Sequence, residues 1–235
     1  MNMHQPVCAI VGVGPGNGAA FARRFSEAGY RIALIARSSE TIQTLAQALP
    51  NSYAYTCDIT DQESVQMAFE AIQNEMGEID TLIYNAGAGI WRNVEDISVE
   101  DFEQSWRVNA LGSFLAARQV IPAMKRNGRG NMIFIGATAS RRGNVLTAAF
   151  APAKAAQKSL VESMARYLGP SGIHVSLLIL DGVVDTPATR KMFSDKPDEF
   201  FMQPEDIAEV AYNTASQKYS AWSSEVEIRP YVERW

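Results

Sequence analysis

The stretch "VGVGPGNGAA" at residues 11–20 places Gly12, Gly16 and Gly18 in the spacing G-x-x-x-G-x-G. The short apolar run "PVCAIVG" (6–12) precedes it, and "NGAAFARRFSEAG" (17–29), with apolar residues every three or four positions, follows it. This order predicts a buried strand, a tight glycine turn and an amphipathic helix. Because the first N–H groups of a helix have no partner within the helix, we expect the turn to bind a phosphate.

The rest of the chain alternates between strand and helix patterns. Like the first strand, "RIALIA" (31–36) is a short apolar run typical of a parallel strand buried on both faces. Further strands are expected at "YAYTCD" (53–58), "IDTLIYNAG" (79–87), "NMIFIGA" (131–137), "HVSLLILDG" (174–182) and "SEVEIRP" (224–230). Helical segments are expected at 61–76, 99–126, 148–168 and 204–217. The alternation predicts an α/β fold: one Rossmann-type, doubly wound parallel sheet of about seven strands with helices on both faces. A single domain is expected over residues 1–235, with its ligand crevice at the carboxyl ends of the strands.

Composition excludes several functional classes. The chain has 235 residues, 47% of them hydrophobic, and a formal net charge of -5. Without a basic run, a nucleic-acid partner is not expected, and no apolar run is long enough to span a membrane. Cys8 and Cys57 lie within apparent strands and read as buried thiols, and the histidines and cysteines lack metal-ligand spacing. We therefore expect a cytoplasmic protein that binds no metal.

The end of the second strand indicates which dinucleotide is preferred. An acidic residue there would bind the adenosine ribose hydroxyl of NAD. Here the sequence is "IALIARSSE", which places Ala36 and then Arg37 at this point. A guanidinium group suits a ribose 2′-phosphate, so NADP(H) is expected in preference to NAD(H). The alternative is that Arg37 is a solvated surface residue.

Several motifs, in order, resemble those of the short-chain dehydrogenase/reductase family along nearly the whole chain. They are "GVGPGNG" (12–18), "CDIT" (57–60), "NAG" (85–87), the asparagine of "VNALGSF" (108–114) and "DGVVDT" (181–186). The resemblance implies that Asp58 contacts the adenine and that Thr186 holds the nicotinamide carboxamide. The implied cofactor-binding residues are Gly12, Gly14, Pro15, Gly16, Asn17, Gly18, Arg37, Asp58, Ile59, Asn85, Ala86, Gly87, Lys154, Gly182, Val184 and Thr186. Pro15 stands where many NADP-preferring members have a basic residue.

The catalytic positions depart from the family's pattern. The family uses a serine, a tyrosine, a lysine and an asparagine, and Lys154 and Asn109 match the last two. Phe150 replaces the tyrosine, and Ala137, thirteen residues earlier, replaces the serine. The departures fall on the groups that handle the substrate oxygen and leave the cofactor groups in place. We expect an oxidoreductase with a non-standard proton donor, acting on a small carbonyl, enone or imine-type molecule; the alternative is a cofactor-binding protein without redox turnover.

Three routes would replace the missing acid. Asp181 stands at the end of a strand where the family usually has proline, and an apolar wall at Phe150 would raise its pKa; the alternative is a turn cap facing away. Thr138 and Ser140 would donate hydrogen bonds, unless they only shape their loop. A substrate that is already electrophilic, such as an iminium, would need less help. Arg141 and Arg142 would face an anionic substrate or be solvated.

Residues 187–203 occupy the region that forms the mobile substrate lid in the family. Met192, Phe193, Phe200 and Phe201 would give this lid an apolar inner face, and Trp91 would add a wall to the substrate pocket. The alternative is that these side chains pack the lid onto the protein.

The resemblance also implies assembly through the helices at 99–126 and 148–168. Small residues on these helices would permit close packing between subunits: Ala110, Gly112, Ala116, Ala153 and Ala156. A homodimer or a homotetramer is therefore expected.

Overall fold

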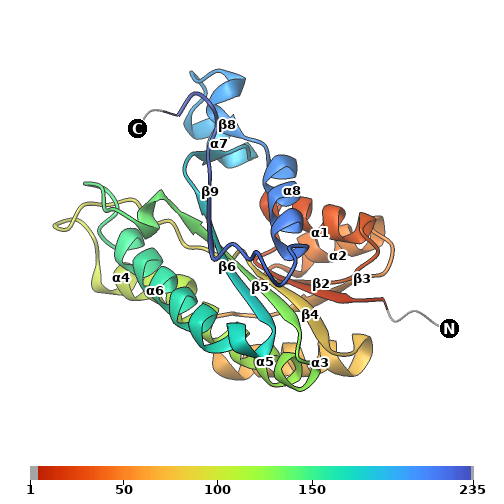
Figure 1. Cartoon of the computed structure of the whole chain (residues 1–235). Helices are drawn as coiled ribbons and strands as arrows, with labels where there is room; N and C mark the ends of the chain where they lie inside the picture. Colours follow the sequence, from red (N-terminus) through yellow and green to blue (C-terminus); the bar gives the residue numbers. More distant parts are fainter. Residues whose placement is uncertain (1–4, 234–235) are drawn as a thin grey trace.

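Seven parallel strands form the central sheet of the computed structural model, which describes residues 5–233 (Figure 1). The strand order is β3-β2-β1-β4-β5-β6-β9. The strands are β1 (Val7–Val11), β2 (Arg31–Ala36), β3 (Ser52–Thr56), β4 (Ile79–Tyr84), β5 (Gly130–Ala137), β6 (Ile173–Leu180) and β9 (Glu225–Ile228). The expected doubly wound parallel sheet is confirmed. The ends of the expected 1–235 domain, residues 1–4 and 234–235, lie outside the described residues.

Helices cover both faces of the sheet (Figure 1). One face carries α1 (Asn17–Glu27), α2 (Ser39–Ala48) and α8 (Pro204–Ala215); the other carries α3 (Gln62–Met76), α4 (Val99–Trp106), α5 (Gly112–Asn127) and α6 (Phe150–Leu168). Successive strand residues point to opposite faces, so Ala9 joins one apolar core and Ile10 the other. Burial of the inner strands on both faces explains their continuous apolar runs, whereas the edge strands β3 and β9 are only partly buried.

The helices begin and end where local chemistry permits. Asp61 caps α3 by accepting a hydrogen bond from the Ser64 N–H at 3.0 Å, and Gly77, with φ of 93°, ends it. Helix α6 begins at Phe150, two residues later than expected, so Pro152 lies in the first turn, where its missing N–H costs no hydrogen bond. Phe150 and Lys154 therefore lie one above the other at the start of α6.

A π-helical turn, Arg107–Leu111, separates α4 from α5. The sequence predicted only a mainly helical segment here. The Tyr84 hydroxyl donates a 2.5 Å hydrogen bond to the Val108 carbonyl within this turn. Gly112 makes that approach possible, because a Cβ atom there would lie 2.3 Å from the Tyr84 hydroxyl. The turn holds Asn109 in the buried interior, and π turns of this kind often occur at functional sites.

The expected lid has a regular structure of its own. It contains α7 (Pro187–Met192), a short turn at Asp198–Phe200 and β8 (Phe201–Met202), which pairs with β7 (Val183–Val184). Arg190 holds it together through ion pairs with Asp185 at 2.6 Å and Asp198 at 2.5 Å. The rings of Phe193, Phe200 and Phe201 pack against one another, whereas Met192 is exposed.

The small residues expected between subunits are mostly internal, which corrects that interpretation. Ala110, Gly112, Ala116 and Ala153 are buried within the subunit. They allow helices to approach the sheet and one another inside one chain. The same helical segment exposes larger apolar side chains, Phe102, Trp106 and Phe114.

We predict that Gly112→Ala destabilises the fold. The new methyl group would displace the buried Tyr84 hydroxyl or the Ile59 backbone, and overpacking of this kind costs roughly 1–3 kcal/mol. Gly169→Ala is the control, since a Cβ atom there meets nothing within 4 Å and its backbone, with φ of −52°, suits alanine. Urea denaturation would measure both variants; equal unfolding midpoints would contradict the packing argument.

Candidate active site

A crevice of about 800 Å³ lies at the carboxyl ends of the central strands. The structure brings eight of the expected cofactor-binding residues together along its wall: Gly12, Gly14, Arg37, Asp58, Ile59, Asn85, Ala86 and Gly87. These residues come from the ends of four neighbouring strands, β1 to β4. The position agrees with the rule that ligands of open α/β sheets bind beyond the carboxyl ends of the strands.

The glycine loop is shaped by contact with the chain after β4. Gly12 has a φ of +86°, and a Cβ atom there would lie 2.4 Å from the Ala86 nitrogen. The Asn85 side-chain amide donates to the Gly12 carbonyl at 2.8 Å, which holds the two segments together. Nothing lies within 4 Å of a Cβ atom built on Gly14, so the loop leaves open space there.

The start of α1 faces this space. Pro15 is exposed, and α1 begins at Asn17, whose buried Oδ1 atom has no hydrogen-bond partner among the described residues. Gly18 packs so closely on Val13 that a Cβ atom would lie 2.6 Å away. The unpaired N–H groups of the first helical turn would therefore meet an anion placed beside Gly14.

The far end of the crevice is charged. Arg37 is exposed along its wall, near Asp58. Hydrogen bonds from the Thr60 N–H and hydroxyl hold the pKa of Asp58 below its ordinary value, and the positive charge of Arg37 contributes in the same direction. Arg37 and Asp58 thus line the same crevice.

Lys154 and Asn109 meet on the other side of Gly87. A Cβ atom built on Gly87 would lie 3.5 Å from Asn109 Oδ1 and 3.9 Å from Lys154 Nζ. Asn109 donates from Nδ2 to the Ser105 carbonyl at 2.8 Å, while its buried Oδ1 has no partner among the described residues. Lys154 is only 4% exposed, and this burial lowers its pKa to about 7.

Lys154 has two hydrogen-bond acceptors inside the protein. Its Nζ donates to the Ile135 carbonyl at 2.7 Å and to Gln157 Oε1 at 3.0 Å. Sequence analysis did not single out Gln157. The only available signal was a polar residue three positions after Lys154, on the same helical face.

The positions without hydroxyl groups make an apolar wall. Ala137 is the last residue of β5. The Phe150 ring lies 5.8 Å from the Trp91 ring, between centroids, and 6.0 Å from Lys154 Nζ. The structure therefore places Trp91 beside the position of the family's tyrosine.

Asp181 lies in a polar environment, which corrects the expectation of an apolar one. The Thr138 hydroxyl donates to Asp181 Oδ1 at 2.5 Å. Guanidinium groups of Arg229 and Arg142 lie 3.6 Å and 3.9 Å from its carboxylate. The carboxylate is thus turned toward the loop after β5 and does not cap a turn facing away. Ser140 is buried and accepts a hydrogen bond from the Ala137 N–H at 3.2 Å, so its hydroxyl shapes the loop.

A charged cluster extends from Asp181 along the edge strand β9. Glu227 pairs with both Arg229 and Arg141. Arg141 also pairs with Glu225, and Glu225 with Lys158 of α6. Arg141 is thus an exposed arginine that pairs with two carboxylates of β9, and Arg142 is largely exposed as well. Arg229 and Glu227 were missed because neither lies near Asp181 in the sequence.

The segment after β6 passes beside the glycine loop. A Cβ atom on Gly16 would lie 2.8 Å from Thr186 Cγ2, so Thr186 reaches the crevice region. Thr186 also caps α7 by accepting from the Thr189 N–H at 3.2 Å. Gly182 packs against Pro230 and Met202, and Val184 pairs with Met202. The structure places Met192 and Phe193 at the end of α7, with Phe193 packed on Phe200 and Met192 exposed.

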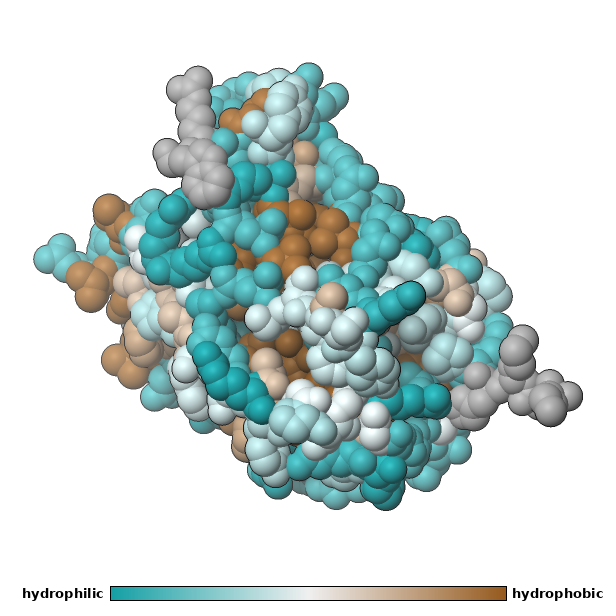
Figure 2. Space-filling view, viewed as in Figure 1, coloured by the Kyte–Doolittle hydropathy of each residue, from teal (hydrophilic) through white to brown (hydrophobic). Residues whose placement is uncertain are grey.

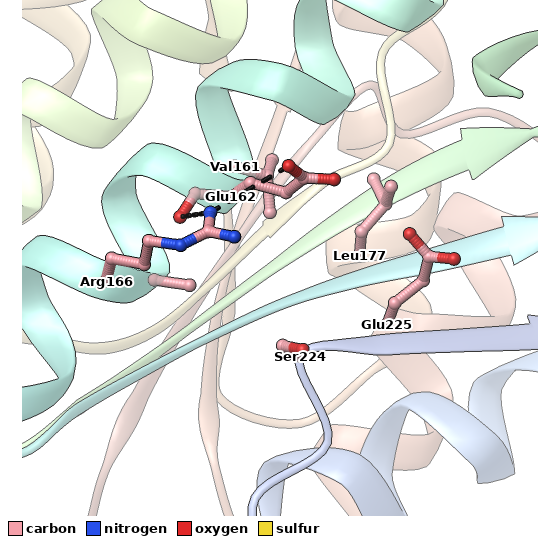
Figure 3. Close-up of a pocket in the computed structure, with 7 residues that line it drawn as sticks. Val161, Glu162, Arg166, Leu177, Ser224 and Glu225 are labelled. Atoms are coloured by element: carbon pink, nitrogen blue, oxygen red, sulfur yellow. Dashed lines mark hydrogen bonds and ion pairs between the residues drawn. The ribbon is translucent and has the colours of Figure 1, made fainter.

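Two other hollows lie away from these residues. One of about 400 Å³ lies between α6 and β9; Figure 3 shows Glu162 and Arg166 paired on one side and Glu225 on the other. Figure 2 shows an apolar hollow between β9 and α8, where Ile207, Val210 and Ile228 line a space of about 500 Å³. Neither contains a residue that lines the crevice. Within residues 5–233 no cluster of histidine, cysteine or acidic side chains is arranged to hold a metal ion, and no helix has the length and apolar character of a membrane span.

Comparison with known proteins agrees with this geometry. Residues 6–197 match the family model described as short chain dehydrogenase. The chain is 28% identical over 232 residues to the 7alpha-hydroxysteroid dehydrogenase of Escherichia coli K12, covering 93% of this chain and 91% of that protein. It is 30% identical over 183 residues to the 3-oxoacyl-[acyl-carrier-protein] reductase MabA of Mycobacterium bovis, covering 78% and 71% of the two chains.

A solved structure shares the whole architecture. The crystal structure of a metagenomic short-chain oxidoreductase in complex with NADP superposes with a TM-score of 0.83 at 26% identity, covering 97% of this chain and 98% of that one. The match of the family model to residues 6–197, together with the shared parallel sheet and glycine loop, shows that the chain belongs to the short-chain dehydrogenase family, whose members are oxidoreductases.

Proposed function

We propose that the protein is an NADP(H)-dependent oxidoreductase of a small carbonyl, enone or imine-type substrate, with a proton donor other than tyrosine. One observation carries the proposal: the crevice keeps the glycine loop, and Lys154 and Asn109 lie beside Gly87 of its wall, while Phe150 and Ala137 stand at the two hydroxyl positions. Relatives with dehydrogenase and reductase names, and a relative in complex with NADP, support the redox class.

The residues of the crevice fit a nicotinamide dinucleotide. The pyrophosphate would lie beside Gly14 and the α1 N-terminus, where there is open space and the first N–H groups of the helix could donate to it. Asp58 and Ile59 would contact the adenine, and Arg37 the 2′-phosphate. Lys154 would donate to the nicotinamide ribose, and Thr186 to the carboxamide. When bound, the cofactor would supply or accept the hydride.

The proton path is proposed to run through Thr138 and Asp181. In reduction, the substrate oxygen or nitrogen that gains negative charge would take the Thr138 hydroxyl proton, and Thr138 would take a proton from the Asp181 carboxyl group. In oxidation, the same two transfers run in reverse, with Asp181 as the base. The 2.5 Å hydrogen bond, with the hydroxyl as donor and the carboxylate as acceptor, is the arrangement that the oxidation direction needs.

Phe150 and Trp91 would shape the substrate side. Their rings lie 5.8 Å apart between centroids and present apolar surface where the family has a phenol. Such a wall favours a substrate with a flat apolar group and gives no hydrogen bond to its oxygen. A conjugated carbonyl or an iminium suits this site better than a simple ketone, because each is already electrophilic.

The second candidate is a cofactor-binding protein without redox turnover. The observation that favours it is the loss of both hydroxyl groups that would handle the substrate oxygen. Incubation with NADPH and a panel of aldehydes, diketones, enones and imines, followed by nicotinamide absorbance, separates the two. Cofactor binding without consumption, together with activity in a Phe150→Tyr/Ala137→Ser variant, would support the second candidate. Consumption by the native protein supports the first.

We predict that NADPH binds more tightly than NADH and that Arg37→Asp reverses the order. A charge-assisted hydrogen bond contributes about 1.5–3 kcal/mol, so the loss should be roughly tenfold to a hundredfold in affinity for NADPH. Fluorescence titration measures both affinities. The matched control is Arg118→Asp, an exposed arginine of α5 with the same charge change. Equal native affinities would contradict the role of Arg37.

We predict that Asp181→Asn lowers kcat by roughly 100- to 10,000-fold, the range for a lost general acid or base. Thr138→Val should lower it as well, because it interrupts the same path. Affinity for NADPH should change little in either variant. The control is Glu162→Gln, an acid of α6 on the hollow of Figure 3. Turnover of Asp181→Asn at the native rate would place the proton donor elsewhere.

We also propose that the protein assembles as a homodimer or a homotetramer. Three partly exposed aromatic side chains of one helical segment, Phe102, Trp106 and Phe114, support an interface there. Light scattering at micromolar concentration should show at least a dimer, and Trp106→Glu should shift it toward monomer. A monomeric native protein would overturn this proposal.

A further inference from the structure

A buried polar chain connects Lys154 with the π-helical turn. Gln157 is wholly buried on α6; its Oε1 accepts from Lys154 Nζ at 3.0 Å and its Nε2 donates to Ser113 Oγ at 2.8 Å. The Ser113 hydroxyl in turn donates to the Asn109 carbonyl at 2.6 Å. Two side chains, Gln157 and Ser113, thus join Lys154 to the backbone of Asn109, and these are the two active-site residues that match the family pattern.

The direction of each hydrogen bond in this chain is fixed. Ser113 has one hydroxyl proton, which is given to the Asn109 carbonyl, so its oxygen is the acceptor toward Gln157. The amide NH₂ of Gln157 must face Ser113, and its carbonyl oxygen must face Lys154. If the Gln157 amide were flipped, its NH₂ group would face the N–H groups of Lys154, and its carbonyl oxygen would face the Ser113 oxygen, so neither hydrogen bond would form.

The same geometry determines what remains free on Lys154. An ammonium group has three donors, and two of them are taken by the Ile135 carbonyl and Gln157 Oε1. The third is left for the Gly87 side, where Asn109 Oδ1 is an acceptor without a described partner. Of the two groups that accept a hydrogen bond from Lys154 Nζ, only Gln157 is a side chain. Its loss would therefore leave the ammonium group free to turn away from Gln157.

The neighbours of Lys154 in the described residues carry no opposite charge. From α6 the Phe150 ring and Gln157 face it, from β5 the Ile135 carbonyl, and from the other side Gly87 and Asn109. Burial alone lowers its pKa to about 7, with no acid or base contributing. The balance between amine and ammonium therefore depends on a few neutral dipoles.

We propose that Gln157 is a positioning residue that sets both the direction and the charge of Lys154, so that cofactor binding takes up one proton. The inference rests on the proposed function in one respect, the placement of the cofactor ribose against Lys154. Ribose hydroxyls as acceptors and phosphate charges both favour the ammonium form. Affinity for the cofactor is then highest below pH 7 and falls, by at most tenfold per pH unit, as the pH rises through 7.

The first experiment titrates Lys154 in the free protein. NMR of protein labelled with ¹³C at lysine Cε follows each lysine, and the Lys154→Met spectrum identifies its signal. The native midpoint is expected near pH 7. Gln157→Glu places a carboxylate against Nζ and should raise the midpoint by one unit or more. Gln157→Leu, of similar size and without an acceptor, should lower it.

Opposite shifts separate a positioning role from a structural one. The decisive variant is Gln157→Leu: if Gln157 only fills space, this variant leaves the lysine midpoint unchanged, whatever it does to stability. A native midpoint at the ordinary value near 10.5 would overturn the proposal without any variant. If Gln157→Glu does not fold, Gln157→Asn, whose shorter side chain withdraws the oxygen, should lower the midpoint as Gln157→Leu does.

The second experiment measures dissociation constants from pH 6 to pH 9. NADH is the probe, because it lacks the 2′-phosphate that itself titrates near about pH 6. The pH at which affinity falls should move upward in Gln157→Glu and downward in Gln157→Leu, with the lysine midpoint. If the titration midpoint of Lys154 shifts in the variants but no cofactor binds, the proposed function is refuted and the role of Gln157 is retained. Binding that does not depend on pH in all three proteins would overturn the coupling.

Discussion

The close approach of the glycine loop to the chain after β4 is the constraint on which the site depends. A Cβ atom at Gly12 would lie 2.4 Å from the Ala86 nitrogen, and the Asn85 amide binds the Gly12 carbonyl across the gap. Two neighbouring strands of a parallel sheet are thereby joined just beyond their carboxyl ends. The two segments in contact form part of the crevice wall. Gly87, which follows Ala86 in this wall, lies beside Asn109 and Lys154. One backbone contact would thus position the two parts of the site proposed for the phosphates and the nicotinamide ribose of a dinucleotide.

Asp181 and Lys154 each belong to a network of polar side chains, and the two networks differ in whether their members carry charge. Asp181 belongs to an ionic cluster in which Arg229, Glu227 and Arg141 alternate in sign along β9. Lys154 belongs to a neutral one, in which amide, hydroxyl and carbonyl dipoles replace a counter-ion. A buried cation held by dipoles alone is easy to neutralise, because no opposite charge favours its charged form. Asp181 therefore has charged neighbours, whereas Lys154 has only neutral ones.

Most of the fold could be predicted from sequence, because a parallel strand buried on both faces leaves an unmistakable apolar run. The glycine loop and the "NAG" segment were equally readable, since backbone approach requires glycine. The rest depended on contacts distant in the chain. Nothing in "VNALGSF" signals a π turn, which needs the Tyr84 hydroxyl from β4. Likewise, Arg229 reaches Asp181 only because β9 pairs with β6. Small residues were assigned to a subunit interface because sequence shows their size but not their direction.

The replacement of tyrosine by phenylalanine bears on why a lysine with a pKa near 7 is tolerable here. Where a phenol must be kept acidic, the neighbouring lysine has to remain a cation, so a strongly lowered pKa would impair it. With Phe150 in that position, 6.0 Å from Nζ, the requirement disappears. Lys154 can then be buried more deeply, and a neutral acceptor such as Gln157 is sufficient to hold its Nζ in place. The absence of a phenol at position 150 and the presence of Gln157 are connected in this way, because a lysine with only a neutral acceptor is sufficient where no phenol has to be kept acidic. On the proposed function, Lys154 would still hold the cofactor ribose, and its charge would be set by the Gln157 amide with which it is hydrogen-bonded.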